Sequence, residues 1–316
     1  MTKTATFTLM LNRVIFFIAS QTHILDLAGP VQVFYESAEY GHPCEIIYLS
    51  DQPEKACSSG LMIGQLQHIN DVRIRQEDII FIPGFQLKAD NQALKNWLIN
   101  IAHIGATLCS VCTGSFALAA AGVLNGQGCT THWKYTQRLQ DEYPETKVFT
   151  NRLFVKSGNI YTSAGITTGI DLALFIIEER HGPAFAWQLA AELVVYIRRD
   201  GDDSQQSVYL RYRRHINNHI HQVQDYIIHH LDQKLSLDLL AARVHTGSRN
   251  LTRMFKAATG ITIGQYIDQL RVEKAVNLLK EKNKVTIVAQ QCGFKSVVQL
   301  RSMVKKYTGE LPSKMS

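Results

Sequence analysis

A cysteine occupies the turn between a strand and a helix that the pattern of apolar residues predicts. Residues 106–111 form a short apolar run typical of a buried strand, and a helical pattern follows at residues 114–121, so Cys112 and Thr113 join the two. A sharp strand-to-helix turn exposes one side chain at the carboxyl edge of a sheet, which is the geometry of a nucleophile elbow. We expect a lowered thiol pKa for Cys112, because the dipole of the following helix favours the thiolate.

Other chemical groups follow neighbouring predicted strands. Asp26 is a carboxylate in an otherwise apolar segment after the first strand, and His132, which follows Thr130 and Thr131, is a candidate to supply an imidazole. The backbone N–H groups of Gly84 and Phe85 are candidates to stabilise an oxyanion. The alternatives are structural: Asp26 accepts hydrogen bonds from a turn, and His132 is a satisfied structural histidine. The candidate residues at this edge of the sheet are Asp26, Gly84, Phe85, Cys112, Thr113 and His132.

The spacing of the cysteines and histidines predicts no metal site. Cys109 and Cys112 are separated by two residues, but Cys109 falls inside the predicted strand. His215, His219 and His221 cluster without cysteine or carboxylate partners at zinc-ligand spacing. We therefore expect neither a metal nor a cofactor.

A second set of candidate residues lies on two predicted helix-turn-helix units in the last third of the chain. In the first unit, a short helix at Leu237–Arg243 precedes a helix at residues 248–257. In the second unit, Val285–Gln291 precedes residues 296–307, and a helix at residues 263–280 joins the two units. The second helix of such a unit can enter the major groove of DNA, and two linked units can address successive grooves.

Helical spacing assigns roles to the side chains of these units. Three apolar residues of the helix at 248–257 must face the core, which leaves Arg249, Thr252 and Arg253 for base edges. Lys256 and Arg271 are better placed for phosphates. The alternative is a solvated face of an ordinary helical bundle. The predicted DNA contacts are Arg249, Asn250, Thr252, Arg253, Lys256, Arg271, Gln299, Arg301, Ser302 and Lys305.

Charge separates the two parts of the chain. Residues 1–200 carry 15 Lys/Arg and 18 Asp/Glu, whereas residues 201–316 carry 18 Lys/Arg and 9 Asp/Glu, a net charge of +9. This asymmetry suggests that the second part binds a polyanion, with a solvated lysine-rich surface as the alternative.

The composition, 46% hydrophobic and 19% charged, excludes a disordered or collagenous chain. No apolar run approaches the ~18 residues of a membrane span. Without a signal-peptide pattern, the six cysteines are expected to be reduced in the cytoplasm.

The elements that must position these residues fall into two classes. The first 200 residues alternate strands with amphipathic helices, which predicts an α/β domain with a doubly wound, mostly parallel sheet. Strands are predicted at residues 13–18, 45–49, 78–82 and 106–111, a hairpin at 147–155 and 159–162, and helices at 29–38, 86–101, 168–179 and 184–197. The predicted domains are residues 12–198 and an all-α domain at 215–316, separated by a linker at 199–214. The all-α domain begins with an apolar stripe formed by Ile216, Ile220, Val223, Ile227 and Leu231.

Residues 215–316 resemble the DNA-binding domain of the AraC/XylS family of bacterial transcription regulators. The matching segments are residues 239–241, 250–256, 270–275, 278–279, 292–294 and 305–309. Gly247 replaces the serine helix cap usual in the family, which costs only a few tenths of a kcal/mol. Val297 and Val298 replace polar residues, so we expect the second unit to contribute mainly phosphate contacts, or methyl contacts to thymine.

Residues 12–198 resemble the PfpI/ThiJ-like division of the class I glutamine amidotransferase fold, which is flavodoxin-like. The matching segments are residues 25–30, 83–84, 112–122, 130–133, 162–165 and 169–173. The resemblance implies that the pocket at the cysteine turn is the ligand site.

The two resemblances together imply a sequence-specific DNA-binding transcription regulator, with activation as the expected outcome. The implied effector is a small nitrogenous metabolite, such as an amino acid or a quaternary amine, bound by the N-terminal domain. The expected partners are double-stranded promoter DNA and this effector, with a homodimer and a contact to RNA polymerase as further candidates and no membrane. Two alternatives are a Cys-dependent hydrolase or hydratase that uses Cys112, and a redox sensor that uses the same thiol.

Overall fold

The computed structural model describes residues 12–89, 91–195, 199–201, 205, 207–213, 215–280 and 283–314. The chain divides into two compact units, Met1–Gln205 and Gln206–Ser316. The predicted linker is only partly described, because residues 202–204, 206 and 214 lie outside these ranges, as do residues 196–198 at the end of the first predicted domain. Within the described residues, no helix has both the length and the apolar character needed to cross a membrane.

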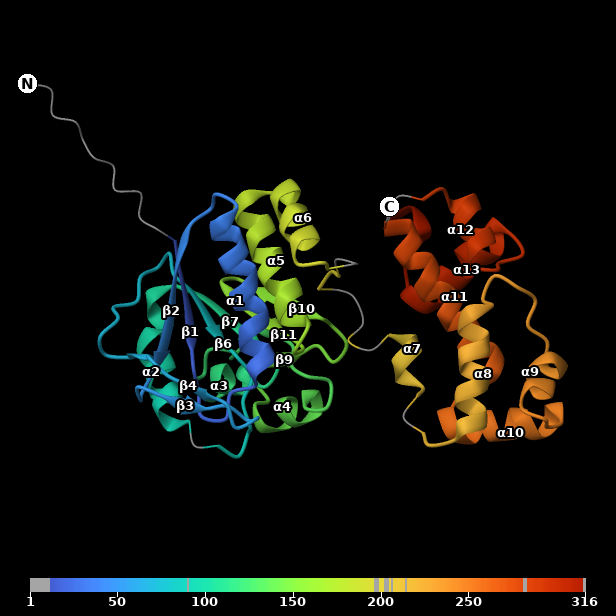
Figure 1. Cartoon of the computed structure of the whole chain (residues 1–316), viewed down its shortest axis with the longest axis horizontal. Helices are drawn as coiled ribbons and strands as arrows, with labels where there is room; N and C mark the ends of the chain where they lie inside the picture. The colour runs from blue at the N-terminus through green and yellow to red at the C-terminus, as the bar shows by residue number, and fades with distance from the viewer. Residues whose placement is uncertain are drawn as a thin grey trace, which may run out of the picture. The chain divides into compact units, whose positions relative to one another are not determined.

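The first unit is built on a seven-stranded sheet in the order β10-β11-β7-β6-β1-β2-β5 (Figure 1). Every neighbouring pair is parallel except β10 and β11, which form an antiparallel hairpin. The strands of this sheet are β1 (Asn12–Phe17), β2 (Cys44–Ser50), β5 (Gln67–His68), β6 (Ile79–Ile82), β7 (Thr107–Val111), β10 (Phe154–Ser157) and β11 (Ile160–Ser163). Two small ribbons pair β3 (Lys55–Ala56) with β4 (Met62–Ile63) and β8 (Gly128–Cys129) with β9 (Lys147–Val148).

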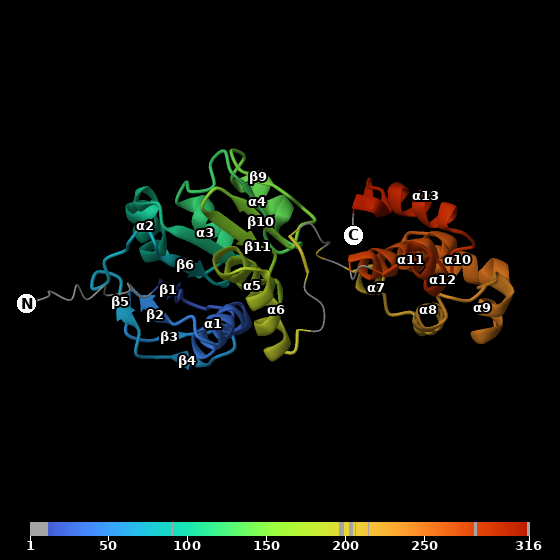
Figure 2. The same cartoon turned by 90° about the horizontal axis from the view of Figure 1, so that it is seen from above.

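Helices cover both faces of the sheet (Figure 2). Successive side chains of a strand point to opposite faces, so Val14 and Phe16 enter one core while Ile15 and Phe17 enter the other. The first core is closed by α1 (Ile24–Glu39), α5 (Thr168–His181) and α6 (Pro183–Glu192). The second is closed by α2 (Gln92–Ile101), η1 (Ala102–Ile104), α3 (Gly114–Ala120) and α4 (Thr136–Glu142).

The predicted doubly wound α/β class is confirmed, but several element bounds were wrong. The helix predicted at residues 29–38 begins at Ile24, and the helix predicted at residues 184–197 ends at Glu192. Residues 147–155 do not form one strand: Lys147–Val148 pairs with β8, and the hairpin partner of β11 begins at Phe154. The helix expected from residue 86 begins at Gln92, because a loop separates it from β6.

The second unit is entirely helical among its described residues (Figure 1). Its helices are α7 (Val208–Arg211), α8 (Asn218–His229), α9 (Leu237–Arg243), α10 (Ser248–Thr259), α11 (Ile263–Lys280), α12 (Val285–Gln291), α13 (Val297–Thr308) and η2 (Pro312–Lys314). The short helix α7 lies within the segment predicted as linker, and its Val208 is buried in the core of this unit.

The predicted apolar stripe at the start of this unit is buried except at its first member. Ile216 is 99% exposed, whereas Ile220, Val223, Ile227 and Leu231 are buried. The side chain of Asn217 caps α8 by accepting a hydrogen bond from the backbone N–H of Ile220. The helix therefore starts after Ile216, which is left outside its apolar face.

One helix belongs to two hydrophobic cores. Tyr266 and Leu270 of α11 pack with α8, α9 and α10, whereas Ala275 and Leu279 pack with α12 and α13. Because both cores use the same helix, α11 fixes the separation of the two helix-turn-helix units.

Both helix-turn-helix turns contain a residue in the left-handed region, two positions after the first helix ends. These residues are His245, with φ +50°, and Gly293, with φ +72°. A Cβ atom at residue 293 would lie 2.2 Å from the carbonyl oxygen of Leu231 and 2.8 Å from Nη2 of Arg271. Glycine is therefore required at this turn by both its backbone angle and its close approach to α8.

We predict that Gly293→Ala lowers the free energy of unfolding of the helical unit by at least about 2 kcal/mol, because it adds a steric clash to left-handed strain. Gly309→Ala is the matched control, since Gly309 has φ +80° but nothing within 4 Å of its Cβ position. Urea unfolding of the full chain followed by circular dichroism measures the loss. Tryptophan fluorescence monitors the first unit separately, because Trp97, Trp133 and Trp187 all belong to it. Equal losses in the two variants would contradict the predicted clash.

Candidate functional site

The turn between β7 and α3 is sharp and places Cys112 at the carboxyl edge of the sheet. Cys112 has φ +56°, a left-handed conformation that is uncommon for a residue with a side chain. Its backbone N–H donates to the carbonyl oxygen of Ser163 at the end of β11. The predicted elbow geometry is thus present, although the Cys112 side chain is buried rather than exposed.

The carboxylate of Asp26 lies against this elbow. Asp26 is fully buried in the first turn of α1, and its Oδ2 atom lies 3.3 Å from Nδ1 of His23. Gly84 makes the approach possible, because a Cβ atom there would lie 2.2 Å from Asp26 Oδ2 and 3.0 Å from Cys112 Cβ. Asp26 Oδ1 has no hydrogen-bond partner among the described residues, so one carboxylate oxygen remains available to a ligand.

The predicted lowering of the Cys112 pKa was wrong. Burial raises the pKa of the Cys112 thiol, and the neighbouring Asp26 carboxylate raises it further. Hydrogen bonds from Thr113 favour the thiolate but do not overcome these two effects. Cys112 is therefore a protonated thiol at neutral pH in this environment.

The predicted oxyanion role of Phe85 does not agree with its hydrogen bonds. The backbone N–H of Phe85 donates to Thr113 Oγ1 at 2.8 Å, and the Thr113 hydroxyl is 2.7 Å from the Phe85 carbonyl oxygen. These contacts hold the loop after β6 against the elbow. Phe85 and Thr113 thus stabilise the site instead of offering free donors to a ligand.

His132 lies close to Gly165, which also approaches Cys112. A Cβ atom at Gly165 would lie 3.3 Å from Cys112 Sγ and 3.3 Å from His132 Cδ2. The half-buried ring of His132 packs beside Trp133, with 5.2 Å between ring centroids. The structure therefore brings together Asp26, Gly84, Cys112, Thr113 and His132, which were predicted from separate segments.

His23 is a site residue that the sequence analysis missed. It is the residue before α1, and its Nδ1 atom faces the buried carboxylate of Asp26 three positions later. The spacing of His23 and Asp26 at a helix start was the available signal. The pair becomes part of the site only because it lies next to Cys112, which is distant in sequence.

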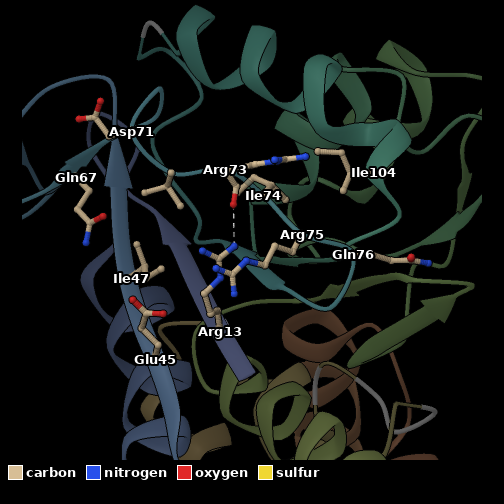
Figure 3. Close-up of a pocket in the computed structure, with 11 residues that line it drawn as sticks. Arg13, Glu45, Ile47, Gln67, Asp71, Arg73, Ile74, Arg75, Gln76 and Ile104 are labelled. Atoms are coloured by element: carbon tan, nitrogen blue, oxygen red, sulfur yellow. Dashed lines mark hydrogen bonds between the residues drawn. The ribbon is translucent and has the colours of Figure 1, made fainter. Parts of the chain in front are cut away.

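A separate hollow of about 730 Å³ lies at the amino ends of β1 and β6, away from the elbow (Figure 3). Arg13 spans its floor: Nε donates to Asp78 Oδ1 at 2.9 Å, and Nη2 donates to the Arg73 carbonyl oxygen at 2.8 Å. Glu45 and Asp71 line the hollow together with Arg73. Because Nε and Nη2 of Arg13 are both hydrogen-bonded and the lining charges are mixed, we interpret the Arg13–Asp78 pair as structural.

The first recognition helix, α10, presents a polar face. Arg249, Asn250, Arg253 and Lys256 are exposed, while Leu251 and Phe255 are fully buried. Thr252 is half-buried, and its hydroxyl donates to the Ser248 carbonyl oxygen. Arg253 Nη2 donates to Asn250 Oδ1 at 3.0 Å, which orients two of the predicted base-reading side chains relative to each other.

The second recognition helix, α13, is capped differently and presents fewer polar groups in its first turn. Ser296 caps it by accepting from the Gln299 N–H, and Gln299 Oε1 accepts from the Lys295 N–H. This pairing resembles a capping box and occupies the Gln299 carboxamide oxygen. Val298 is 74% exposed in the same turn. Arg301, Ser302 and Lys305 are exposed further along the helix, as expected.

The structure gives Arg271 a role other than the predicted phosphate contact. Its Nε atom donates to the Leu231 carbonyl oxygen at 2.9 Å, and Nη2 donates to the Gln233 carbonyl oxygen at 2.8 Å. Burial lowers the pKa of Arg271. The guanidinium thus connects the end of α8 to the helix that carries both units, and we remove Arg271 from the proposed DNA contacts.

Comparison with known proteins gives the two parts of the chain separate relatives. Residues 12–179 match the model of the DJ-1/PfpI family, and residues 240–316 match that of a helix-turn-helix domain. The chain is 35% identical over 227 residues to the HTH-type transcriptional regulator CdhR of Pseudomonas aeruginosa, covering 71% of this chain and 67% of CdhR. It spans 58% to 67% of the length of the first regulators that it matches.

An enzyme and a solved structure are also similar to part of the chain. The chain is 32% identical over 172 residues to isonitrile hydratase of Pseudomonas putida, covering 53% of this chain and 71% of the enzyme. An AraC family transcriptional regulator structure from Pseudomonas putida aligns with a TM-score of 0.52 at 19% identity, covering 58% of this chain and 99% of that one. This last similarity supports the fold alone.

We predict that Asp26→Asn increases the rate at which Cys112 is alkylated by iodoacetamide at mildly alkaline pH. Removing the carboxylate charge lowers the thiol pKa, so a larger fraction is thiolate at a given pH, about tenfold more per unit of pKa. Peptide mass spectrometry over time measures the rate at each cysteine. Cys44 is the internal control, because burial alone raises its pKa and its rate should not change. An unchanged or slower rate at Cys112 would show that Asp26 does not control this thiol.

Proposed function

Because the chain belongs to the DJ-1/PfpI family and carries a C-terminal helix-turn-helix domain, we propose that it is a transcription regulator that binds promoter DNA sequence-specifically. The observation that carries the proposal is the exposed polar face of α10, which stands on a buried apolar face in a basic helical unit. Activation of transcription upon binding of a small metabolite is the mode of action that we propose.

The first unit in this proposal reads base edges from the start of α10. Arg249 and Arg253 have the planar guanidinium groups that pair with guanine, and Asn250 has the carboxamide that pairs with adenine. The hydrogen bond between Arg253 and Asn250 orders both side chains before DNA is bound. Lys256, one turn further along, is assigned to a phosphate.

The second unit in this proposal contributes less direct readout. The exposed side chain of Val298 is apolar, and its counterpart on a base edge is the C5-methyl group of thymine. Arg301, Ser302 and Lys305 are assigned mainly to the DNA backbone, where they hold the protein in register. In this proposal, the first unit determines sequence specificity, and the second unit mainly positions the protein on the DNA.

The elbow is the proposed effector site. The unpartnered Asp26 Oδ1 atom is suited to an ammonium group. This feature supports a small nitrogenous metabolite, such as an amino acid or a quaternary amine. Asp26, Gly84, Cys112 and His132 are the residues that we assign to this pocket, with Phe85 and Thr113 holding its loops.

A chain of hydrogen bonds leads from the elbow to the boundary between the two units. The Thr131 hydroxyl donates to the Cys112 carbonyl oxygen at 2.8 Å. The Gln205 carboxamide donates to the Thr131 carbonyl oxygen at 3.0 Å and to Thr130 Oγ1 at 3.1 Å. Gln205 is the last residue of the first unit. We infer that an effector at the elbow changes DNA binding by favouring one state of this connection, which requires different affinities for the two states.

Selection of binding sites from a random duplex library by the full-length protein tests the proposed function. A recurring sequence motif is expected. Failure to prefer any sequence over competitor duplex, with and without metabolites, would overturn the proposed function.

A thermal-shift screen of amino acids and betaine-like amines on the full chain tests the effector class. Asp26→Asn is the variant expected to lose the increase in melting temperature.

A second candidate function is a Cys-dependent hydrolase or hydratase, favoured by the elbow angle of Cys112 and the similarity to isonitrile hydratase. Incubation of the wild type and Cys112→Ser with isonitriles and with metabolites that shift the melting temperature separates the functions. Turnover that depends on Cys112 supports the enzyme. Metabolite-dependent DNA binding without consumption supports the regulator, and a response to peroxide alone supports a redox sensor.

We predict that Arg253→Ala costs about 1–3 kcal/mol of binding free energy on a selected site and relaxes selectivity at one base pair. Fluorescence anisotropy on the selected site and its single-base variants measures both effects. The matched control is Arg211→Ala, a change in the same unit outside both helix-turn-helix segments. An equal loss on random-sequence duplex would show that Arg253 does not read a base.

We predict that Lys305→Ala weakens binding to all duplexes to a similar degree and reduces the salt slope of log affinity by about one, because one phosphate contact is lost. Affinities measured over a series of salt concentrations give the slope. A loss confined to one sequence, or an unchanged slope, would contradict the phosphate assignment.

A further inference from the structure

Three potential metal ligands of different types converge below the elbow. A ring nitrogen of His23, a carboxylate oxygen of Asp26 and the Sγ atom of Cys112 all lie within 4.8 Å of one another. His23 and Asp26 follow β1, whereas Cys112 follows β7. The three residues are therefore brought together only when the parallel sheet folds.

The environment of these ligands favours a cation. Asp26 is fully buried, yet its Oδ1 atom has no hydrogen-bond partner among the described residues. A buried carboxylate oxygen without a partner is costly. Among the described ion pairs, the one that Asp26 forms is with His23, at 3.3 Å. Because that pair is ionic only when His23 is protonated, a bound cation would satisfy the carboxylate more completely.

One of the three ligands is partly exposed. The His23 side chain is 33% exposed, while Asp26 and Cys112 are buried. His23 is therefore the ligand through which the cluster is in contact with solvent. The Gly84 backbone closes the other side, since no Cβ atom fits between it and Asp26.

We propose that His23, Asp26 and Cys112 bind a divalent transition-metal ion of borderline softness, for which Zn²⁺ is the best match, through one nitrogen, one oxygen and one sulfur atom. Zn²⁺ takes these three donor types at about 2.0–2.3 Å in tetrahedral geometry, which places ligand atoms roughly 3.3–3.8 Å apart. The observed spread of up to 4.8 Å requires the side chains to close by about 1 Å. Three protein ligands leave the fourth position open to water or to an added ligand.

Binding is coupled to loss of a proton. The S–H bond of Cys112 breaks, its proton passes to solvent, and a metal–sulfur bond forms with the thiolate. The positive charge of the ion offsets the effect of the Asp26 carboxylate on the thiol. The site is independent of DNA recognition, and it adds a metal to the pocket in which the proposed function places the metabolite.

Co²⁺, a spectroscopic probe for Zn²⁺, tests this site. It is titrated into the tag-free full-length protein in the presence of a phosphine reductant that does not compete for metal. A thiolate-to-cobalt charge-transfer band that saturates at one ion per chain, and that Zn²⁺ abolishes, is expected. The thiolate band is essential, because surface histidine pairs such as His215 with His221 can also bind metal but contain no sulfur.

Four variants assign the ligands. Cys112→Ser should abolish the band, and Asp26→Asn should weaken Co²⁺ binding by at least about tenfold, since losing even an outer-shell partner costs that much. His23→Ala should weaken it similarly, and its partly exposed position makes a folding defect least expected. Cys44→Ser, in a half-buried thiol of β2, should leave binding unchanged.

A missing charge-transfer band in the wild type, or a band that survives Cys112→Ser, would overturn the site. So would unchanged affinity in His23→Ala. Selection of DNA sites by the same preparation is scored separately, so failure of metal binding with successful selection refutes only this inference.

Discussion

The parallel direction of the strands is the constraint on which the first unit depends. Because β1, β6, β7 and β11 all run the same way, the loops that follow them meet at one edge of the sheet. That single edge collects Asp26 from the first loop, Gly84 from the second, Cys112 from the third and Gly165 from the fourth. Hydrogen bonds between Phe85 and Thr113 then fix two of these loops against each other.

The electrostatics of this edge favour binding over reactivity. A catalytic cysteine requires a stabilised thiolate, whereas burial and Asp26 stabilise the thiol of Cys112. The same arrangement leaves one buried carboxylate oxygen, Asp26 Oδ1, without a hydrogen-bond partner among the described residues. Such an oxygen is suited to the proposed cationic ligand, and hydrogen bonds of Thr131 and Gln205 connect the elbow to the end of the unit.

The local pattern of apolar residues predicted most helices and strands, and the features that it missed depend on tertiary contacts. The bounds of α9, α11 and α12 agree with prediction because their apolar spacing and turns are set by adjacent residues. The high pKa of Cys112, the structural role of Arg271 and the participation of His23 depend on groups distant in sequence, which periodicity cannot show. Ile216 was misassigned because the stripe continues one residue beyond the cap at Asn217. Asp26, Gly84 and Cys112 were found because each follows a predicted strand.

The shared helix α11, 18 residues and about 27 Å long, sets the distance between α10 and α13, the two helices that we propose contact DNA. Inserting one base pair between the two half-sites shifts the second by about 3.4 Å along the duplex and turns it by roughly 35°. Two domains joined by a flexible linker can adapt to such a change in spacing, but two helix-turn-helix units whose cores share one rigid helix cannot. The corresponding operators should therefore be asymmetric sequences of constant internal spacing, read by a single chain in one direction.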